Sequence, residues 1–278
     1  MKTKLLILLR VFGFLLIYIF VFGSFQLLAA WLTGMGFSDE SAMTEIQLLA
    51  TNVAGFIATL LVLYVFTRWV DKIPFVDIGL QTSRFNDFFK GLLFGFVPIA
   101  LGFISLYALG LIKDIQVRAD GFKLLLTFLA FVLVAFNEEA FMRGYVLRNL
   151  MLISNKYIAL IISALLFALL HIDNDHINLI GLTNIFLAGI LLGLSYIYTK
   201  NLWFPIGLHL AWNFSQSLFG FNVSGNSTYS LINYQLTGEM PWLTGGKFGF
   251  EASVLSLVFE LILIIAIYFL FKNQKPVQ

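Results

Sequence analysis

The chain has 278 residues, of which 60% are hydrophobic and 12% are charged, and its mean hydropathy is +0.91. Soluble domains are about half apolar and a quarter charged, so this composition excludes a soluble protein and indicates a polytopic membrane protein. The net charge is only +2, with basic residues spread between apolar segments, and cysteine is absent. These features exclude a nucleic-acid-binding patch, thiol catalysis and disulfides.

Eight apolar segments follow one another along the chain. A transmembrane helix needs about 20 mainly apolar residues, and the fifth, sixth and seventh segments are short by this measure. The fourth segment could continue as far as residue 153. The sequence therefore predicts an all-α bundle of about eight transmembrane helices forming a single integral membrane domain over residues 1–278. The predicted spans are 5–32, 46–66, 88–112, 122–142, 157–171, 183–199, 203–220 and 252–271.

The basic residues predict the orientation of this bundle. Cytoplasmic loops of membrane proteins carry an excess of lysine and arginine. If the N-terminus is inside, 13 of the 17 basic residues fall on the inner side: Lys2, Lys4, Arg10, Arg68, Lys72, Arg84, Lys90, Arg143, Arg148, Lys156, Lys200, Lys272 and Lys275. We therefore expect both termini to be cytoplasmic.

Two adjacent carboxylates, Glu138 and Glu139, end a long apolar run, and Arg143 follows. Carboxylates at membrane depth are costly and usually mark a functional site. Neighbours on a helix point about 100° apart, whereas residues four apart lie side by side. We expect Glu139 and Arg143 to neutralise each other and Glu138 to face a cavity. A buried ion pair that only fixes helix packing is the alternative, but it leaves the second glutamate unexplained.

Two of the three histidines lie in apolar segments. His171 ends the fifth segment, one turn after Phe167, and His209 lies in the seventh, one turn before Asn213. Residues four apart share one helix face, so Asn213 is expected beside His209 and Phe167 against His171. The third histidine, His176, is expected in a solvated loop.

These side chains suit hydrolysis of an amide without a covalent intermediate. A carboxylate can accept a proton from water, and an imidazole with an amide can stabilise an oxyanion. Alternatively, Glu138, His171 and His209 could hold Zn²⁺ with an open position for water. Aspartyl and serine chemistries have less support, because no aspartate lies well within a span and no Gly-x-Ser-x-Gly sequence occurs.

Three motifs together resemble the CAAX-protease and bacteriocin-processing family of glutamate-type intramembrane endopeptidases, also called the Abi family. The first, Glu-Glu-x-x-x-Arg, matches residues 138–143; the second, Phe-x-x-x-His, matches 167–171; the third, His-x-x-x-Asn, matches 209–213. The resemblance covers about 122–220, the expected catalytic core. It implies that Glu138 and His171 activate water and that His209 and Asn213 stabilise the oxyanion. It does not decide whether a metal participates.

The resemblance implies a membrane-associated peptide or protein as substrate and the lipid bilayer as surroundings. The compact chain favours a bacterial cell membrane, and a membrane peptide or protein rather than a prenylated substrate. Two other classes stay open: a proton-coupled transporter, and a non-catalytic scaffold or bacteriocin-immunity factor.

Helix lengths raise a geometric difficulty. His171 lies about 21 Å along its segment and His209 about 9 Å along its own, so straight helices along the membrane normal would keep them apart. We expect a tilted or recessed helix and a cavity open to the cytoplasmic side or to lipid.

Overall fold

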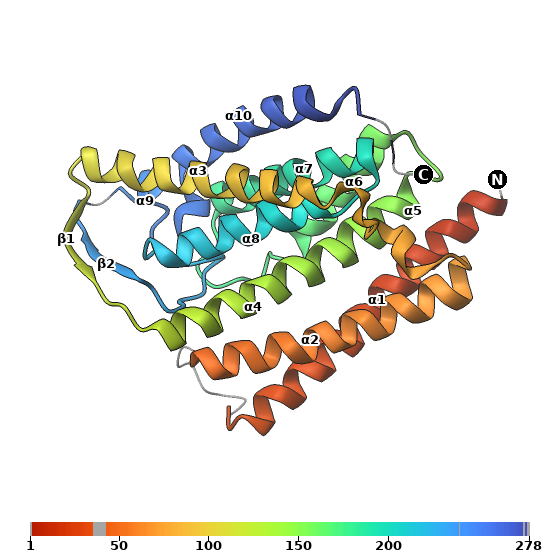
Figure 1. Ribbon diagram of the computed structural model, residues 1–278, viewed down its shortest axis with the longest axis horizontal. Helices are drawn as coiled ribbons and strands as arrows, with labels where there is room; N and C mark the ends of the chain where they lie inside the picture. The colour runs from red at the N-terminus through yellow and green to blue at the C-terminus, as the bar shows by residue number, and fades with distance from the viewer. Residues whose placement is uncertain (1, 36–42, 239, 275, 277–278) are drawn as a thin grey trace.

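The computed structural model describes residues 2–35, 43–238, 240–274 and 276. It is a bundle of helices, and each of the eight predicted apolar segments contains one (Figure 1). The eight principal helices are α1 (Lys2–Leu32), α2 (Glu45–Val65), α3 (Asn86–Ala108), α4 (Gly121–Glu139), α6 (Lys156–Leu169), α7 (Leu179–Thr199), α8 (Trp203–Leu218) and α10 (Val254–Phe271).

Six stretches of helix in the described residues are long and apolar enough to cross a membrane. They are Lys4–Leu32, Glu45–Asp71, Asn86–Ala108, Gly121–Leu150, Leu179–Thr199 and Val254–Phe271. Helices α6, with 14 residues, and α8, with 16 residues, are shorter. The chain is therefore a multi-pass membrane protein with six candidate spans, and the prediction of eight spans is confirmed only for these six.

Short elements join the long helices. Two are π-helical, η1 (Phe66–Asp71) and η4 (Ala140–Leu147), and three are 3₁₀ turns, η2 (Phe75–Ile78), η3 (Thr82–Arg84) and η5 (Phe250–Ala252). The remaining short helices are α5 (Arg148–Leu150) and α9 (Pro241–Thr244). Helix α4 continues through η4 into α5, so the fourth predicted segment does extend well beyond residue 142.

Polar side chains fix where several helices begin. Asn155 precedes α6, and its side chain accepts hydrogen bonds from the backbone N–H groups of Tyr157 and Ile158. Ser253 precedes α10 and accepts one from Ser256. The first N–H groups of a helix have no partner within the helix, so these caps satisfy donors that lipid could not.

A two-stranded antiparallel ribbon was not predicted. Strand β1 (Ile112–Val117) pairs with β2 (Ile232–Leu236), which lies more than a hundred residues later. The predicted third span of 88–112 was therefore too long, because the helix ends at Ala108 and the strand begins at Ile112. Beyond the ribbon, the N–H of Arg118 donates to the carbonyl of Leu231 at 2.9 Å.

The ribbon lies at one end of the bundle, and α1 begins and α10 ends at the other (Figure 1). The start of α1 and the end of α10 thus lie on the same side of the molecule. Which side of the membrane they face stays a prediction. Lys275, which entered that prediction, lies outside the described residues.

Glycines bring α3 and α8 into close contact. A Cβ atom at Gly207 of α8 would clash with the carbonyl oxygen of Phe88, and one at Gly91 of α3 would clash with the carbonyl oxygen of Phe204. Small residues permit such close approach of helices in a membrane. This contact fixes the position of α8, the helix that carries His209.

Aromatic rings fasten the first half of α1 to the segment that follows α4. The ring of Phe14 stacks on Tyr145 with centroids 3.7 Å apart, and the ring of Tyr18 stacks on Phe141 at 4.0 Å. Both partners belong to η4 and are buried. The π-helical segment is therefore enclosed by α1 on this side.

Candidate functional site

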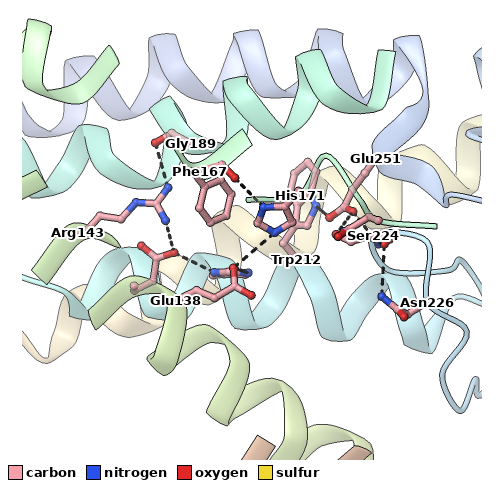
Figure 2. A network of polar contacts seen from close by, with 12 residues as sticks. Glu138, Arg143, Phe167, His171, Gly189, Trp212, Ser224, Asn226 and Glu251 are labelled. Atoms are coloured by element: carbon pink, nitrogen blue, oxygen red, sulfur yellow. Dashed lines mark hydrogen bonds and ion pairs between the residues drawn. The ribbon is translucent and has the colours of Figure 1, made fainter. Parts of the chain in front are cut away.

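Glu138 lies in the last turn of α4, and His171 points toward it (Figure 2). Its Oε2 atom is 4.0 Å from Nε2 of His171 and 3.9 Å from Nε2 of His209. The Glu138 side chain is 34% exposed, although its neighbour Glu139 is fully buried. Glu138 is thus the carboxylate of the pair that faces open space.

The ring of His171 is oriented by Phe167, one turn earlier in α6. Nδ1 of His171 donates a hydrogen bond to the carbonyl oxygen of Phe167 at 2.7 Å, since a carbonyl can only accept. The two rings lie with centroids 4.6 Å apart. In the neutral ring, the proton therefore sits on Nδ1, and Nε2 presents a lone pair toward Glu138.

Glu139 connects two other site residues. Its Oε1 atom accepts a hydrogen bond from Nδ1 of His209 at 2.9 Å and one from Nη1 of Arg143 at 2.8 Å. Arg143 also donates through Nη2 to the carbonyl oxygen of Gly189 on α7 at 3.1 Å, and its guanidinium lies 4.5 Å from the ring centre of Phe167. The predicted ion pair between Glu139 and Arg143 is present, but the bond to His209 was not foreseen.

The helix widens immediately after the two glutamates. Residues 140–147 are π-helical, with Arg143 in the middle of this segment. π-Helical turns are rare and occur frequently at functional sites. All eight residues of η4 are buried, so Arg143 is held in the interior with its charge balanced by Glu139.

One cavity of about 590 Å³ joins the predicted residues. Glu138, His171, His209 and Asn213 all line it. The wall is mainly apolar, and α1, α2, α4 and η4 contribute Tyr18, Ile19, Phe22, Gly23, Leu48, Phe131, Val134 and Phe141. The site therefore has polar groups from α4, from the turn after α6 and from α8 within an apolar pocket large enough for part of a peptide.

The cavity adjoins the loops that were predicted to lie outside. Asn174, Ser224, Asn226 and Thr228 line it, whereas no lining residue comes from 66–90, 143–160 or 199–206. Whether the cavity opens to the cytoplasmic side or to lipid stays a prediction.

The loops beside the cavity are tied to the bundle. Nδ2 of Asn174 donates to the carbonyl oxygen of Ser224 at 3.1 Å, and Oγ of Ser217 donates to that of Tyr229 at 2.7 Å. His176 is exposed in its loop, as predicted.

The close approach of the histidines to Glu138 resolves the difficulty with depth. His171 lies two residues beyond the end of α6, whereas His209 lies in the second turn of α8. Both nevertheless reach Glu138, so α6 and α8 are staggered or tilted rather than level. This agrees with the expectation of a tilted or recessed helix.

The geometry does not support the zinc alternative. A tetrahedral zinc ion with bonds of about 2.0–2.1 Å would bring its oxygen and nitrogen ligands to within about 3.4 Å of each other. Glu138 stands 3.9–4.0 Å from the two histidines, and the described residues contain no group of three His, Cys, Asp or Glu side chains suited to a metal ion. We therefore derive no step through a metal.

Comparison with protein families identifies this part of the chain. Residues 120–215 match the family described as "Type II CAAX prenyl endopeptidase Rce1-like". This stretch of the chain is a domain of that family. Its members are proteases, and the matched stretch contains Glu138, His171, His209 and Asn213. A search of curated proteins found no match.

Some contacts and residues of the site could not be predicted from the spacing of residues along the sequence. The bond between Glu139 and His209 joins residues 70 positions apart. Glu251, which lines the same cavity, directly precedes the predicted span 252–271 and was not singled out. A carboxylate at the edge of an apolar segment was the available signal for Glu251.

Proposed function

We propose that the chain is an intramembrane endopeptidase that hydrolyses a peptide bond of a membrane-associated peptide or protein with activated water. One observation carries the proposal: Oε2 of Glu138 lies 4.0 Å and 3.9 Å from the Nε2 atoms of His171 and His209. These separations are too long for direct hydrogen bonds and suit a bridging water. The family match supports the reaction class.

In this proposal Glu138 is the general base. The carboxylate takes a proton as the water oxygen attacks the carbonyl carbon. Nε2 of His171 accepts the second water hydrogen and orients the attack, because its other nitrogen is committed to Phe167. The proton on Glu138 then passes to the leaving nitrogen as the carbon–nitrogen bond breaks.

His209 and Asn213 stabilise the oxyanion. Protonated His209 donates through Nε2, while Glu139 on Nδ1 holds the ring and stabilises its positive charge. Asn213 donates through its amide from the next turn of α8. Donors aimed at the oxyanion are worth about 10²–10³ in rate each. Glu139 and Arg143 are positioning residues in this scheme.

The test compares membrane peptides from cells that produce wild-type protein, Glu138→Gln or Asp114→Asn. Peptides cut only in the presence of wild type define the substrates. Loss of a general base should lower cleavage of these peptides by about 10²–10⁴-fold. Asp114 is an exposed carboxylate of β1, so Asp114→Asn is the matched control and should cleave normally. Turnover retained by folded, membrane-inserted Glu138→Gln would refute the proposal.

A further inference from the structure

A second group of carboxylates borders the cavity away from Glu138. Glu251 of η5 and Glu260 of α10 both line it, together with Asn184 of α7. In Figure 2, Glu251 lies on the opposite side of Trp212 from Glu138. The reaction described above uses none of these three residues.

Glu251 is held firmly by donors from two elements. Its Oε1 atom accepts from Nε1 of Trp212 at 3.2 Å and Nε2 of Gln216 at 3.0 Å, both on α8. Its Oε2 atom accepts from the backbone N–H of Ser224 at 3.0 Å and from Oγ of Ser224 at 2.8 Å. The sequence thus builds a fixed, buried carboxylate into the wall of the cavity.

Two neighbouring acceptors have no donor. Glu260 is 1% exposed; its Oε1 accepts from Ser256 at 3.2 Å, but its Oε2 has no hydrogen-bond partner among the described residues. Asn184 is also 1% exposed and directs Nδ2 at the carbonyl oxygens of Glu251 and Ser253, at 2.6 Å and 2.9 Å. That bonding fixes the amide orientation, and Oδ1 is left without a donor.

Acidic side chains outnumber basic ones on the cavity wall. The lining residues include the three glutamates Glu138, Glu251 and Glu260, but no lysine or arginine. A buried acceptor without a partner costs roughly 1–3 kcal/mol. A cationic donor would supply both the missing hydrogen bonds and the opposite charge, and such charge-assisted bonds are about twice as strong as neutral ones.

We propose that Glu251, Glu260 and Asn184 form a subsite that binds the ammonium or guanidinium group of a lysine or arginine in the substrate. The inference rests on the proposed peptidase function. Gln216, which touches Glu251, lies seven residues after His209, or about 10 Å along α8. About three extended residues span this distance. The cationic residue therefore belongs two to four positions from the bond that is cut.

Cleavage specificity tests the subsite. Full-length protein in phosphatidylcholine vesicles is given apolar peptides that differ only by lysine, arginine or norleucine at one position, and the cut sites are read by mass spectrometry. Wild type should cut about tenfold better where lysine or arginine stands two to four residues from the cut. Glu260→Gln should lose this preference, and Asp114→Asn should keep it. No preference in wild type, or an equal preference in Glu260→Gln, overturns the subsite.

A binding measurement separates this proposal from the peptidase function. Glu138→Gln protein is titrated with the lysine and norleucine peptides by fluorescence anisotropy. The lysine peptide should bind about tenfold more tightly, and the double variant Glu138→Gln/Glu260→Gln should bind both equally. If wild type cuts no peptide, the peptidase function fails, but this titration still decides the subsite. Equal binding of both peptides to Glu138→Gln overturns it.

A competition experiment tests the subsite even if the Glu260→Gln variant does not fold, because it leaves the side chains of the subsite unchanged. n-Butylammonium should displace the lysine peptide from Glu138→Gln protein, while n-butanol at the same concentration should not. Equal displacement by both compounds would mean that the unpaired acceptors are satisfied by water only, and the subsite is then refuted.

Discussion

Glu139 of α4 holds His209 of α8 through a hydrogen bond of 2.9 Å between Oε1 and Nδ1. The two residues are 70 positions apart in the sequence. The same oxygen accepts from Arg143 at 2.8 Å. One fully buried carboxylate thereby balances the charge of an arginine and sets the orientation of an imidazole. Stability of the helix pair and geometry of the proposed oxyanion site consequently depend on a single side chain.

Glu139→Gln should lower both stability and cleavage. Glutamine can still accept from His209, but Arg143 is left as a buried charge without a carboxylate, which costs roughly 3–5 kcal/mol. Thermal unfolding in detergent should show this loss. In the double variant Glu139→Gln/Arg143→Met the unpaired charge is gone, so stability should partly return while cleavage stays low. Wild-type cleavage by the double variant would show that Glu139 acts only through Arg143.

Phe167→Leu should weaken the site without removing its hydrogen bond. The carbonyl oxygen that accepts from His171 is retained, but the ring beneath the guanidinium of Arg143 is lost, and such contacts are worth about 0.5–2 kcal/mol. We expect a lower unfolding temperature and a reduced cleavage rate. Phe12→Leu changes an exposed ring of α1 and is the control. Equal effects of the two substitutions would contradict the role given to Phe167.

Gly207→Ala should displace α8. The added Cβ atom would clash with the carbonyl oxygen of Phe88, so α3 and α8 must separate. Unfolding temperature and cleavage should both fall, because His209 follows two residues later. Gly13→Ala provides the comparison: a Cβ atom there has no neighbour within 4 Å, and alanine favours a helix by up to about 1 kcal/mol. A tolerated Gly207→Ala would show that the contact between the helices is loose.

Lys200, directly after α7, should titrate well below other lysines. Burial, with the nearby charges of Arg148 and Lys156, lowers the pKa of Lys200 from 10.5 to about 8. Competitive labelling with acetic anhydride, read by mass spectrometry, should give a midpoint near pH 8 for Lys200. Lys113, exposed on β1, is the reference. A midpoint near 10.5 for Lys200 would refute the burial effect.

The same shift predicts a change of stability with pH. The folded state binds this proton more weakly than the unfolded state, so the free energy of unfolding should rise as pH increases from about 8 to about 10.5. Lys200→Met should remove that part of the rise. An identical pH dependence in both proteins would contradict it.

The helices could be predicted from the sequence because backbone groups in lipid must pair within their own segment. Apolar runs therefore located all eight long helices. The ribbon could not be predicted in this way, since Ile112 pairs with Leu236 and neither short strand carries a local signal of its partner. The end of α3 was misplaced for the same reason.

The site could be predicted only as far as contacts within one helix. A spacing of four residues predicted the pair of Glu139 with Arg143, which the structure contains. The approach of His171 and His209 to Glu138 depends on how α4, α6 and α8 are staggered, and the bond from Glu139 to His209 depends on the same packing. The resemblance of the motifs to those of a known family indicated that these helices meet, but it did not predict the distances between their side chains.

The anchored loop beside the cavity affects how a substrate arrives. Moving residues 221–230 aside would break the bonds of Ser224 to Asn174 and Glu251 and that of Tyr229 to Ser217, at about 1 kcal/mol each. Ile19 and Phe22 of α1 lie on the cavity wall, and the ring of Phe22 stacks on Tyr18 with centroids 5.2 Å apart. If the cavity opens to lipid, as predicted, a polypeptide would arrive by lateral diffusion, and turnover would follow its density per area of bilayer rather than its concentration in solution.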